Sequence, residues 1–204
     1  MAKVKICGIT NKEDALYACD SGVDALGFIF AESSPRCVTA EVAAEIVAAL
    51  PPFLSKVGVF VNATTEFIET ICAQAGLDIA QLHGDESPQQ CAALNMPVIK
   101  AFRVNSSFDL NSMTEYPCSA FLLDTFSPNI YGGTGKTFDW HIAIGAKKYG
   151  RVILAGGLNP DNIEQAITAV APYAVDISSG LEKQPGQKDH SKIKQLFDRL
   201  RHLK

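Results

Sequence analysis

Residues 120–124 read Ala-Phe-Leu-Leu-Asp, a buried-strand pattern that ends in a carboxylic acid. Residues 3–7 read Lys-Val-Lys-Ile-Cys and end in a thiol. In a barrel of parallel strands and alternating helices, the carboxyl ends of all the strands open onto one mouth. A proton donor, Asp124, and a proton acceptor, Cys7, would meet at that mouth. The pair therefore points to acid/base chemistry on a small molecule.

Short β-rich runs alternate with longer amphipathic stretches along the whole chain. The expected strands are Lys3–Cys7, Ala25–Phe30, Lys56–Val61, Ile79–Leu82, Val98–Phe102, Ala120–Asp124, Val152–Leu154 and Ala174–Ile177. The expected helices are Lys12–Cys19, Ala40–Leu50, Thr65–Ala75, Pro88–Leu94, Phe108–Glu115, Phe138–Lys147, Asp161–Ala169 and Ser191–Leu203. This alternation predicts a single-domain (β/α)8 TIM barrel over residues 1–204.

A doubly wound open sheet is the rival fold for an alternating chain of this kind. That fold would need a Gly-x-Gly-x-x-Gly fingerprint after an early strand to hold a dinucleotide. The segment after the first strand reads Cys7-Gly8-Ile9-Thr10-Asn11 and lacks it. The barrel is therefore preferred.

The composition predicts a single compact domain that acts on a small molecule. With 47% hydrophobic residues among 204, the chain can bury one sizeable core. A net charge of -4 gives no general attraction for nucleic acid or for an anionic membrane. The six cysteines form no Cys-x-x-Cys pair, no signal peptide is recognised at the start, and no apolar run reaches the ~20 residues of a membrane span. These features predict a cytoplasmic protein with free thiols. The exterior of a barrel reveals little from one sequence, so a monomer and a homodimer are both open.

Two polar segments after the expected strands are candidates for holding a ligand at the mouth. In Ser34-Pro35-Arg36 the proline stiffens the loop, and the guanidinium of Arg36 suits a ligand carboxylate, which it can hold with two parallel hydrogen bonds. His83 follows the fourth strand and is predicted to line the cavity. The neighbouring Asp85 and Glu86 raise a metal site as an alternative, but no second histidine with ligand spacing follows.

Small residues follow the seventh and eighth strands, where barrels of this type commonly bind phosphate. Gly156 and Gly157 lie after one strand, and Ser178, Ser179 and Gly180 after the other. Such residues let backbone N–H groups converge on an anion, so both turns are predicted to bind phosphate.

A glycine-rich stretch, residues 131–137, follows Asp124 and ends in Gly135-Lys136-Thr137. It fails as a P-loop because Ile130 stands where that motif needs its first glycine. It is interpreted as a mobile loop that closes over the mouth, with a plain connection as the alternative.

Several of these segments, in this order, form a highly specific pattern. They are Lys5-Ile6-Cys7-Gly8-Ile9-Thr10, Gly27-Phe28-Ile29-Phe30, Ser34-Pro35-Arg36, Val57-Gly58-Val59-Phe60-Val61-Asn62, Gln81-Leu82-His83-Gly84-Asp85-Glu86, Leu123-Asp124-Thr125, Gly132-Gly133-Thr134-Gly135, Phe138-Asp139-Trp140, Leu154-Ala155-Gly156-Gly157-Leu158 and Asp176-Ile177-Ser178-Ser179-Gly180-Leu181-Glu182. Together they closely resemble the phosphoribosylanthranilate isomerases of tryptophan biosynthesis. Small departures from the family pattern, such as Ala174 where glycine is common, touch none of the candidate residues.

The resemblance implies an Amadori rearrangement without metal or cofactor. N-(5-phosphoribosyl)anthranilate would become 1-(2-carboxyphenylamino)-1-deoxyribulose 5-phosphate. Asp124 would protonate the furanose ring oxygen, and Cys7 would then remove the C2′ proton. Arg36 would hold the anthranilate carboxylate, and the phosphate would sit at Gly156-Gly157 and Ser178-Ser179-Gly180.

Two other functions remain as alternatives. A metal-dependent phosphosugar epimerase would need several His or carboxylate ligands at the mouth, and of the four histidines only His83 ends a strand. A non-catalytic receptor for a phosphorylated ligand would use Arg36 and the glycine turns but would place no demand on Cys7 or Asp124.

Overall fold

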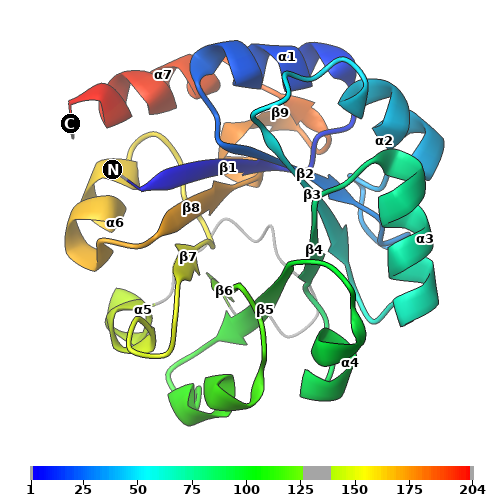
Figure 1. The fold of residues 1–204 in the computed structure, drawn as a ribbon. Helices are drawn as coiled ribbons and strands as arrows, with labels where there is room; N and C mark the ends of the chain where they lie inside the picture. Colours follow the sequence, from blue (N-terminus) through cyan, green and yellow to red (C-terminus); the bar gives the residue numbers. More distant parts are fainter. Residues whose placement is uncertain (1, 126–138, 203–204) are drawn as a thin grey trace.

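The computed structural model describes residues 2–125 and 139–202, and it contains a closed barrel of eight parallel strands arranged in sequence order (Figure 1). The strands are β1 (Lys3–Cys7), β2 (Ala25–Ile29), β3 (Ser55–Phe60), β4 (Ile79–Leu82), β5 (Val98–Val104), β6 (Ala120–Thr125), β7 (Val152–Leu154) and β8 (Ala174–Ile177). Pairing of β1 with β8 closes the barrel, with Lys5 opposite Asp176. The predicted fold class is confirmed.

Helices surround the barrel on its outside (Figure 1). They are α1 (Lys12–Ser21), α2 (Ala40–Val47), α3 (Thr65–Ala75), α4 (Pro88–Ala93), α5 (Trp140–Ala146), α6 (Ile163–Val170) and α7 (His190–Arg201). Side chains of Asn11, Thr39, Thr64 and Ser87 cap the first four by accepting a backbone N–H, which satisfies donors that a helix start leaves unpaired. The expected helix 108–115 is instead a shorter 3-10 helix, η1 (Leu110–Glu115).

Alternation along each strand separates two apolar cores. Inward-facing side chains, including Val57, Ile99, Leu122 and Ile153, fill the barrel interior. Outward-facing side chains such as Leu123 pack against the helices. The same alternation places Cys7 and Asp124 inside the barrel, above this apolar filling.

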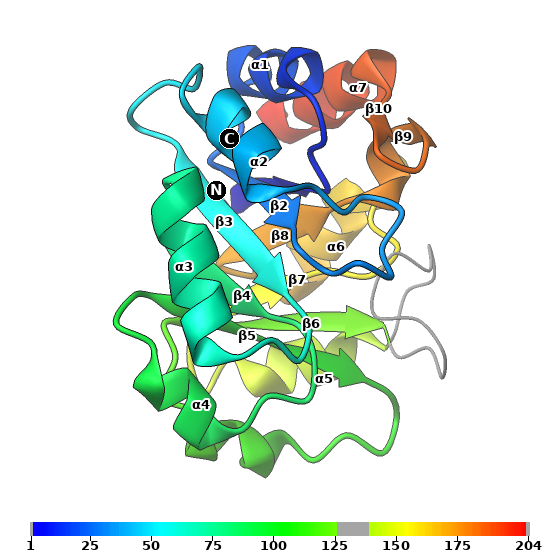
Figure 2. The ribbon, with the colours of Figure 1, turned by 90° about the vertical axis from the view of Figure 1, so that its right-hand side faces the viewer.

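Two short strands that the sequence reasoning missed follow β8. After the 3-10 helix η2 (Ser179–Leu181), β9 (Glu182–Gln184) and β10 (Gln187–Lys188) form an antiparallel hairpin around Gly186, which has a left-handed φ of 80°. The hairpin lies at the end of the barrel toward which the strands point, together with the loop after β2 (Figure 2). The mouth is therefore built from the end of the chain as well as from its βα loops.

None of the described helices is long and apolar enough to cross a bilayer.

Candidate active site

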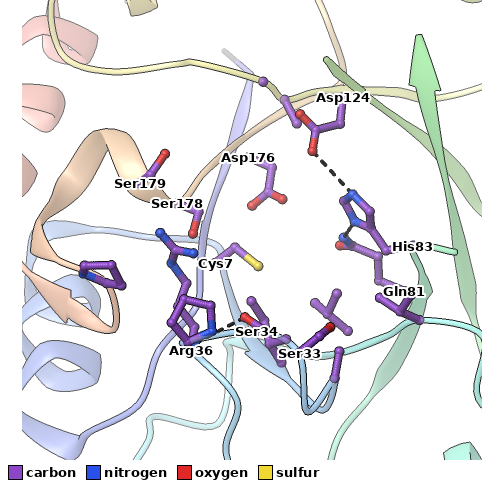
Figure 3. Close-up of a pocket in the computed structure, with 18 of the residues that line it drawn as sticks. Cys7, Ser33, Ser34, Arg36, Gln81, His83, Asp124, Asp176, Ser178 and Ser179 are labelled. Atoms are coloured by element: carbon purple, nitrogen blue, oxygen red, sulfur yellow. Dashed lines mark hydrogen bonds and ion pairs between the residues drawn. The ribbon is translucent and has the colours of Figure 1, made fainter. Parts of the chain in front are cut away.

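A cavity of about 520 Å³ opens at the carboxyl ends of the strands, a volume typical of small-molecule sites. Of the nine residues predicted for the site, eight line it: Cys7, Arg36, His83, Asp124, Gly156, Gly157, Ser178 and Ser179. Gly180 is not part of the lining. In Figure 3 the Cys7 sulfur and the carboxylates of Asp124 and Asp176 all point into the same space. The fold thus brings together side chains from opposite halves of the chain.

Cys7 is buried at the end of β1, among charged groups. Its carbonyl oxygen accepts a hydrogen bond of 2.6 Å from the buried ammonium of Lys188. Burial raises the pKa of the Cys7 thiol, while the positive charges of Lys5 and Lys188 pull that pKa down and the carboxylate of Asp176 pushes it up. The state of this thiol is therefore set by a balance between burial and neighbouring charge.

Asp124 is buried at the end of β6, on the opposite side of the cavity. Its Oδ1 accepts the backbone N–H of Thr125 at 2.7 Å, and its Oδ2 lies 3.3 Å from Nε2 of His83. The Gln81 amide nitrogen donates to Nδ1 of His83 at 2.9 Å, so in the neutral ring the proton sits on Nε2, on the side of Asp124. Within residues 2–125 and 139–202 this approach to Asp124 is at ion-pair distance, but Nε2 forms no hydrogen bond there.

Of the three apolar residues directly before Asp124 on β6, only one faces the barrel interior as Asp124 does. Phe121 and Leu123 face outward into the core under the helices, because side chains alternate along a strand. Leu122 lies two positions before Asp124, so both side chains face the barrel interior, where Leu122 is part of the apolar filling. Gly156 approaches Asp124 so closely that a Cβ there would lie 3.0 Å from Oδ1.

Arg36 lies at the cavity wall with one edge of its guanidinium already occupied. Its Nε and Nη2 donate to the two carboxylate oxygens of Glu182 at 2.8 and 2.7 Å. Lys188 binds the same carboxylate at 3.0 Å. Burial disfavours the charge on Glu182, but the hydrogen bonds and charges of Arg36 and Lys188 outweigh it and lower the pKa of Glu182. Arg36 is thus fixed in place by a buried ionised partner.

The turns after β7 and β8 require glycine for two separate reasons. Gly156 and Gly157 have left-handed φ angles of 83° and 67°, which glycine adopts without strain. The carbonyl of Gly157 is held by the side-chain amides of Asn159 and Asn162 at 3.2 and 3.0 Å. A Cβ on Gly180 would lie 2.0 Å from the carbonyl oxygen of Leu158, so Gly180 allows the two turns to pack together.

Five residues at or behind the cavity were not singled out from the sequence: Lys5, Gln81, Asp176, Glu182 and Lys188. Strand alternation counted back from Cys7 would have identified Lys5 as inward-facing. Nothing local identifies Glu182 or Lys188, because their partners lie far away in the sequence.

Three buried polar atoms at the cavity lack hydrogen-bond partners within the described ranges: Gln81 Oε1, His83 Nε2 and Asp176 Oδ1. A buried polar atom left unpaired costs roughly 1–3 kcal/mol, so such atoms favour a ligand that carries hydroxyl groups. Within the same part of the chain, no group of three or more His, Cys, Asp or Glu side chains is arranged to hold a metal ion. The glycine-rich segment 131–137, interpreted above as a closing loop, lies outside the described residues.

The sequence profile of the family described as N-(5'phosphoribosyl)anthranilate (PRA) isomerase matches residues 4–199. The chain belongs to this family. A relative from Citrifermentans bemidjiense, named N-(5'-phosphoribosyl)anthranilate isomerase, is 54% identical over 197 residues, which cover 97% of this chain and 96% of the relative. The resemblance drawn from the sequence is confirmed.

Solved structures of the family agree with the fold. The phosphoribosyl anthranilate isomerase of Thermus thermophilus has a TM-score of 0.92 and 41% identity, covering 99% of this chain and all of the other. A second isomerase structure, in complex with reduced 1-(o-carboxyphenylamino)-1-deoxyribulose 5-phosphate, has a TM-score of 0.88 and 40% identity at the same coverage.

Proposed function

We propose that this chain isomerises N-(5'-phosphoribosyl)anthranilate to 1-(2-carboxyphenylamino)-1-deoxyribulose 5-phosphate in tryptophan biosynthesis, with Cys7 as general base and Asp124 as general acid. The observation that carries the proposal is the convergence of these two side chains, from β1 and β6, on one cavity. Family membership supplies the reaction. The separate positions of the two side chains in the cavity support the assignment of Cys7 as base and Asp124 as acid.

The rearrangement needs two proton transfers at neighbouring sugar atoms. Asp124 gives its proton to the furanose ring oxygen, the bond from C1′ to that oxygen breaks, and a protonated imine forms between C1′ and the anthranilate nitrogen. The Cys7 thiolate then takes the proton from C2′, and the electron pair of that bond gives an enolamine. Protonation at C1′, together with loss of the proton from the C2′ hydroxyl, converts the enolamine into the 2′-ketone. Each acid or base step of this kind typically contributes ~10²–10⁴-fold.

Arg36 is proposed to hold the anthranilate carboxylate. The carboxylate of Glu182 accepts one hydrogen bond from Nε and one from Nη2 of Arg36. A guanidinium group has five N–H donors in all. The remaining N–H donors of Arg36 suit a second carboxylate, that of the substrate. Glu182 therefore orients Arg36 and still leaves donors for the substrate. A fixed aromatic ring keeps the sugar aligned during both proton transfers.

The phosphate is proposed to bind at the turns after β7 and β8. Gly156, Gly157, Ser178 and Ser179 line the cavity there. The two serines lie across the cavity from His83 (Figure 3). The hydroxyls of the serines and the exposed backbone of the glycines are suitable donors to a phosphate. Gly180 contributes by letting the turns pack closely.

A turnover assay with N-(5'-phosphoribosyl)anthranilate tests the function directly. The isomerase must convert the substrate completely with the purified chain alone. A phosphate-ligand receptor would instead bind the substrate stoichiometrically and release it unchanged. Binding without conversion would reject the proposed function.

The cellular setting is proposed from the thiols and the surface charge. All six cysteines are free, as suits a protein of the reducing cytoplasm. The net charge of -4 favours a small-molecule partner over nucleic acid. Light scattering measures whether the chain is a monomer or a homodimer, the two states the sequence allows.

A further inference from the structure

Lys5 is a buried lysine that has no role in the two proton transfers proposed for Cys7 and Asp124. It precedes Cys7 by two positions on β1, so both side chains face the barrel interior. Only 3% of Lys5 is exposed. Most inward-facing positions nearby hold alanine, valine, isoleucine or leucine. Burying an ammonium group among them is costly unless it is paired, so its presence calls for a physical reason.

Asp176 fixes the position of the Lys5 ammonium. The two residues are opposite each other in the β1–β8 pairing, and Nζ lies 2.9 Å from Oδ2. Both side chains are more than nine-tenths buried. Burial works against the charge on Lys5, but pairing with Asp176 and the nearby Cys7 sulfur outweigh burial and raise the pKa of Lys5. Lys5 therefore stays an ammonium at neutral pH.

Gly27 on β2 opens the space in which Lys5 and Cys7 meet. A Cβ at Gly27 would lie 2.8 Å from the Cys7 sulfur and 3.0 Å from Nζ of Lys5. Both atoms thus lie over the same glycine, and the positive charge of Lys5 favours the thiolate form of Cys7. Any larger residue at position 27 would push the pair apart.

The charged and titratable groups that face Cys7 come from several elements: Lys5 on β1, Asp176 on β8, Lys188 on β10, Arg36 after β2 and, across the cavity, Asp124 and His83. Lys188 directs its ammonium to the carbonyls of Cys7 and Ser178 and to Glu182. Arg36 is engaged with Glu182. Lys5 is thus the cation whose ammonium shares the space over Gly27 with the Cys7 sulfur.

We propose that Lys5, held by Asp176, is a positioning residue that aligns the Cys7 sulfur and stabilises its thiolate. The inference rests on the proposed role of Cys7 as the base. During the C2′ proton transfer the thiolate becomes a thiol, and Lys5 keeps its three protons throughout. Asp176 has the opposite electrostatic effect on the sulfur, because its negative charge opposes the thiolate while its hydrogen bond holds Lys5.

The test is the pH dependence of Cys7 alkylation by iodoacetamide, followed by mass spectrometry of the peptide that contains Cys7. Lys5→Met keeps the length of the side chain and removes its charge, so the alkylation midpoint moves to higher pH and the rate at neutral pH falls about tenfold. Asp176→Asn removes the opposing charge, so the midpoint moves to lower pH. A role in packing alone would move both variants in the same direction or leave both unchanged, and either result would overturn the proposal.

Lys3→Met is the matched control, since Lys3 lies on the same strand two positions earlier and pairs with Asp24 at the other end of the barrel. Its alkylation midpoint stays at the wild-type value. The double variant Lys5→Met/Asp176→Asn removes both charges of the buried pair, so neither is left unpaired to destabilise the fold. Its alkylation midpoint falls between those of the single variants. A midpoint outside that interval contradicts the proposal.

Alkylation does not depend on turnover, so the role of Lys5 can be tested separately from the proposed function. If Cys7→Ala is inactive and the midpoints do not shift, the role of Lys5 is wrong and the proposed function stands. If Cys7→Ala keeps wild-type turnover, the base assignment fails and the inference about Lys5 fails with it. Activity of Lys5→Met gives the corroborating result: the acidic limb of its kcat/KM profile moves to higher pH.

Discussion

The two sides of the mouth differ in charge. Around Cys7 lie the cations of Lys5, Lys188 and Arg36 and the carboxylate of Asp176. Around Asp124 lie the backbone N–H of Thr125 and the ring of His83. A base that must become an anion gains from nearby cations. Among the described residues, the proposed base therefore lies on the side of the cavity where cations gather.

The largest effect is expected from removing either reactive group. Cys7→Ala removes the acceptor of the C2′ proton, and Asp124→Asn removes the donor to the ring oxygen. We expect kcat to fall by ~10²–10⁴-fold in each variant. Steady-state kinetics measure the loss, and calorimetric binding of a product analogue checks that the cavity remains intact. Near-wild-type kcat in either variant would remove that residue from the mechanism.

A smaller effect is expected from Arg36→Lys, which keeps the charge on the Cys7 side but loses the bidentate fork. Without the second hydrogen bond to the substrate carboxylate and to Glu182, KM should rise about tenfold, equivalent to ~1.4 kcal/mol. Arg151→Lys is the matched control, because Arg151 is exposed just before β7, away from the mouth. Equal KM values in the two variants would contradict the carboxylate assignment.

The smallest effect is expected from Gly157→Ala, in the turn proposed to bind phosphate. Its φ of 67° strains any other residue, so the turn should shift and KM should rise several-fold. Gly22→Ala imposes similar strain at φ 102°, at the end of α1 with open space around it. That control should lose stability with KM unchanged. A matching rise in KM for Gly22→Ala would mean that strain alone, not phosphate contact, explains the result.

Much of the barrel could be predicted from the sequence because strand and helix periodicity are local. The strands Lys3–Cys7 and Val152–Leu154 have the predicted bounds. The region 108–115 was harder, because a 3-10 helix buries only Met113 and lacks a long amphipathic repeat. The β9–β10 hairpin was missed because its strands are three and two residues long, too short to show a period.

The candidate site was predictable only in part, for a physical reason. Cys7 and Asp124 end strands, and a parallel barrel brings strand ends together. The partners of these groups come from tertiary contacts that no local pattern reveals. Glu182 meets Arg36 across 146 positions, and Lys5 meets Asp176 across 171. Sequence therefore indicated the reactive groups but not the charges that tune them.

The pH dependence of kcat/KM, measured in the wild type and in the residual activity of Cys7→Ala and Asp124→Asn, tests the proposed role of Cys7 as the base. Burial raises the pKa of Cys7, so the thiolate fraction and the rate should increase with pH along the acidic limb. Cys7→Ala should lose this dependence in its residual activity, whereas Asp124→Asn, which keeps the thiol, should retain it at a lower rate. An acidic limb that persists in Cys7→Ala would contradict the assignment of Cys7 as the base.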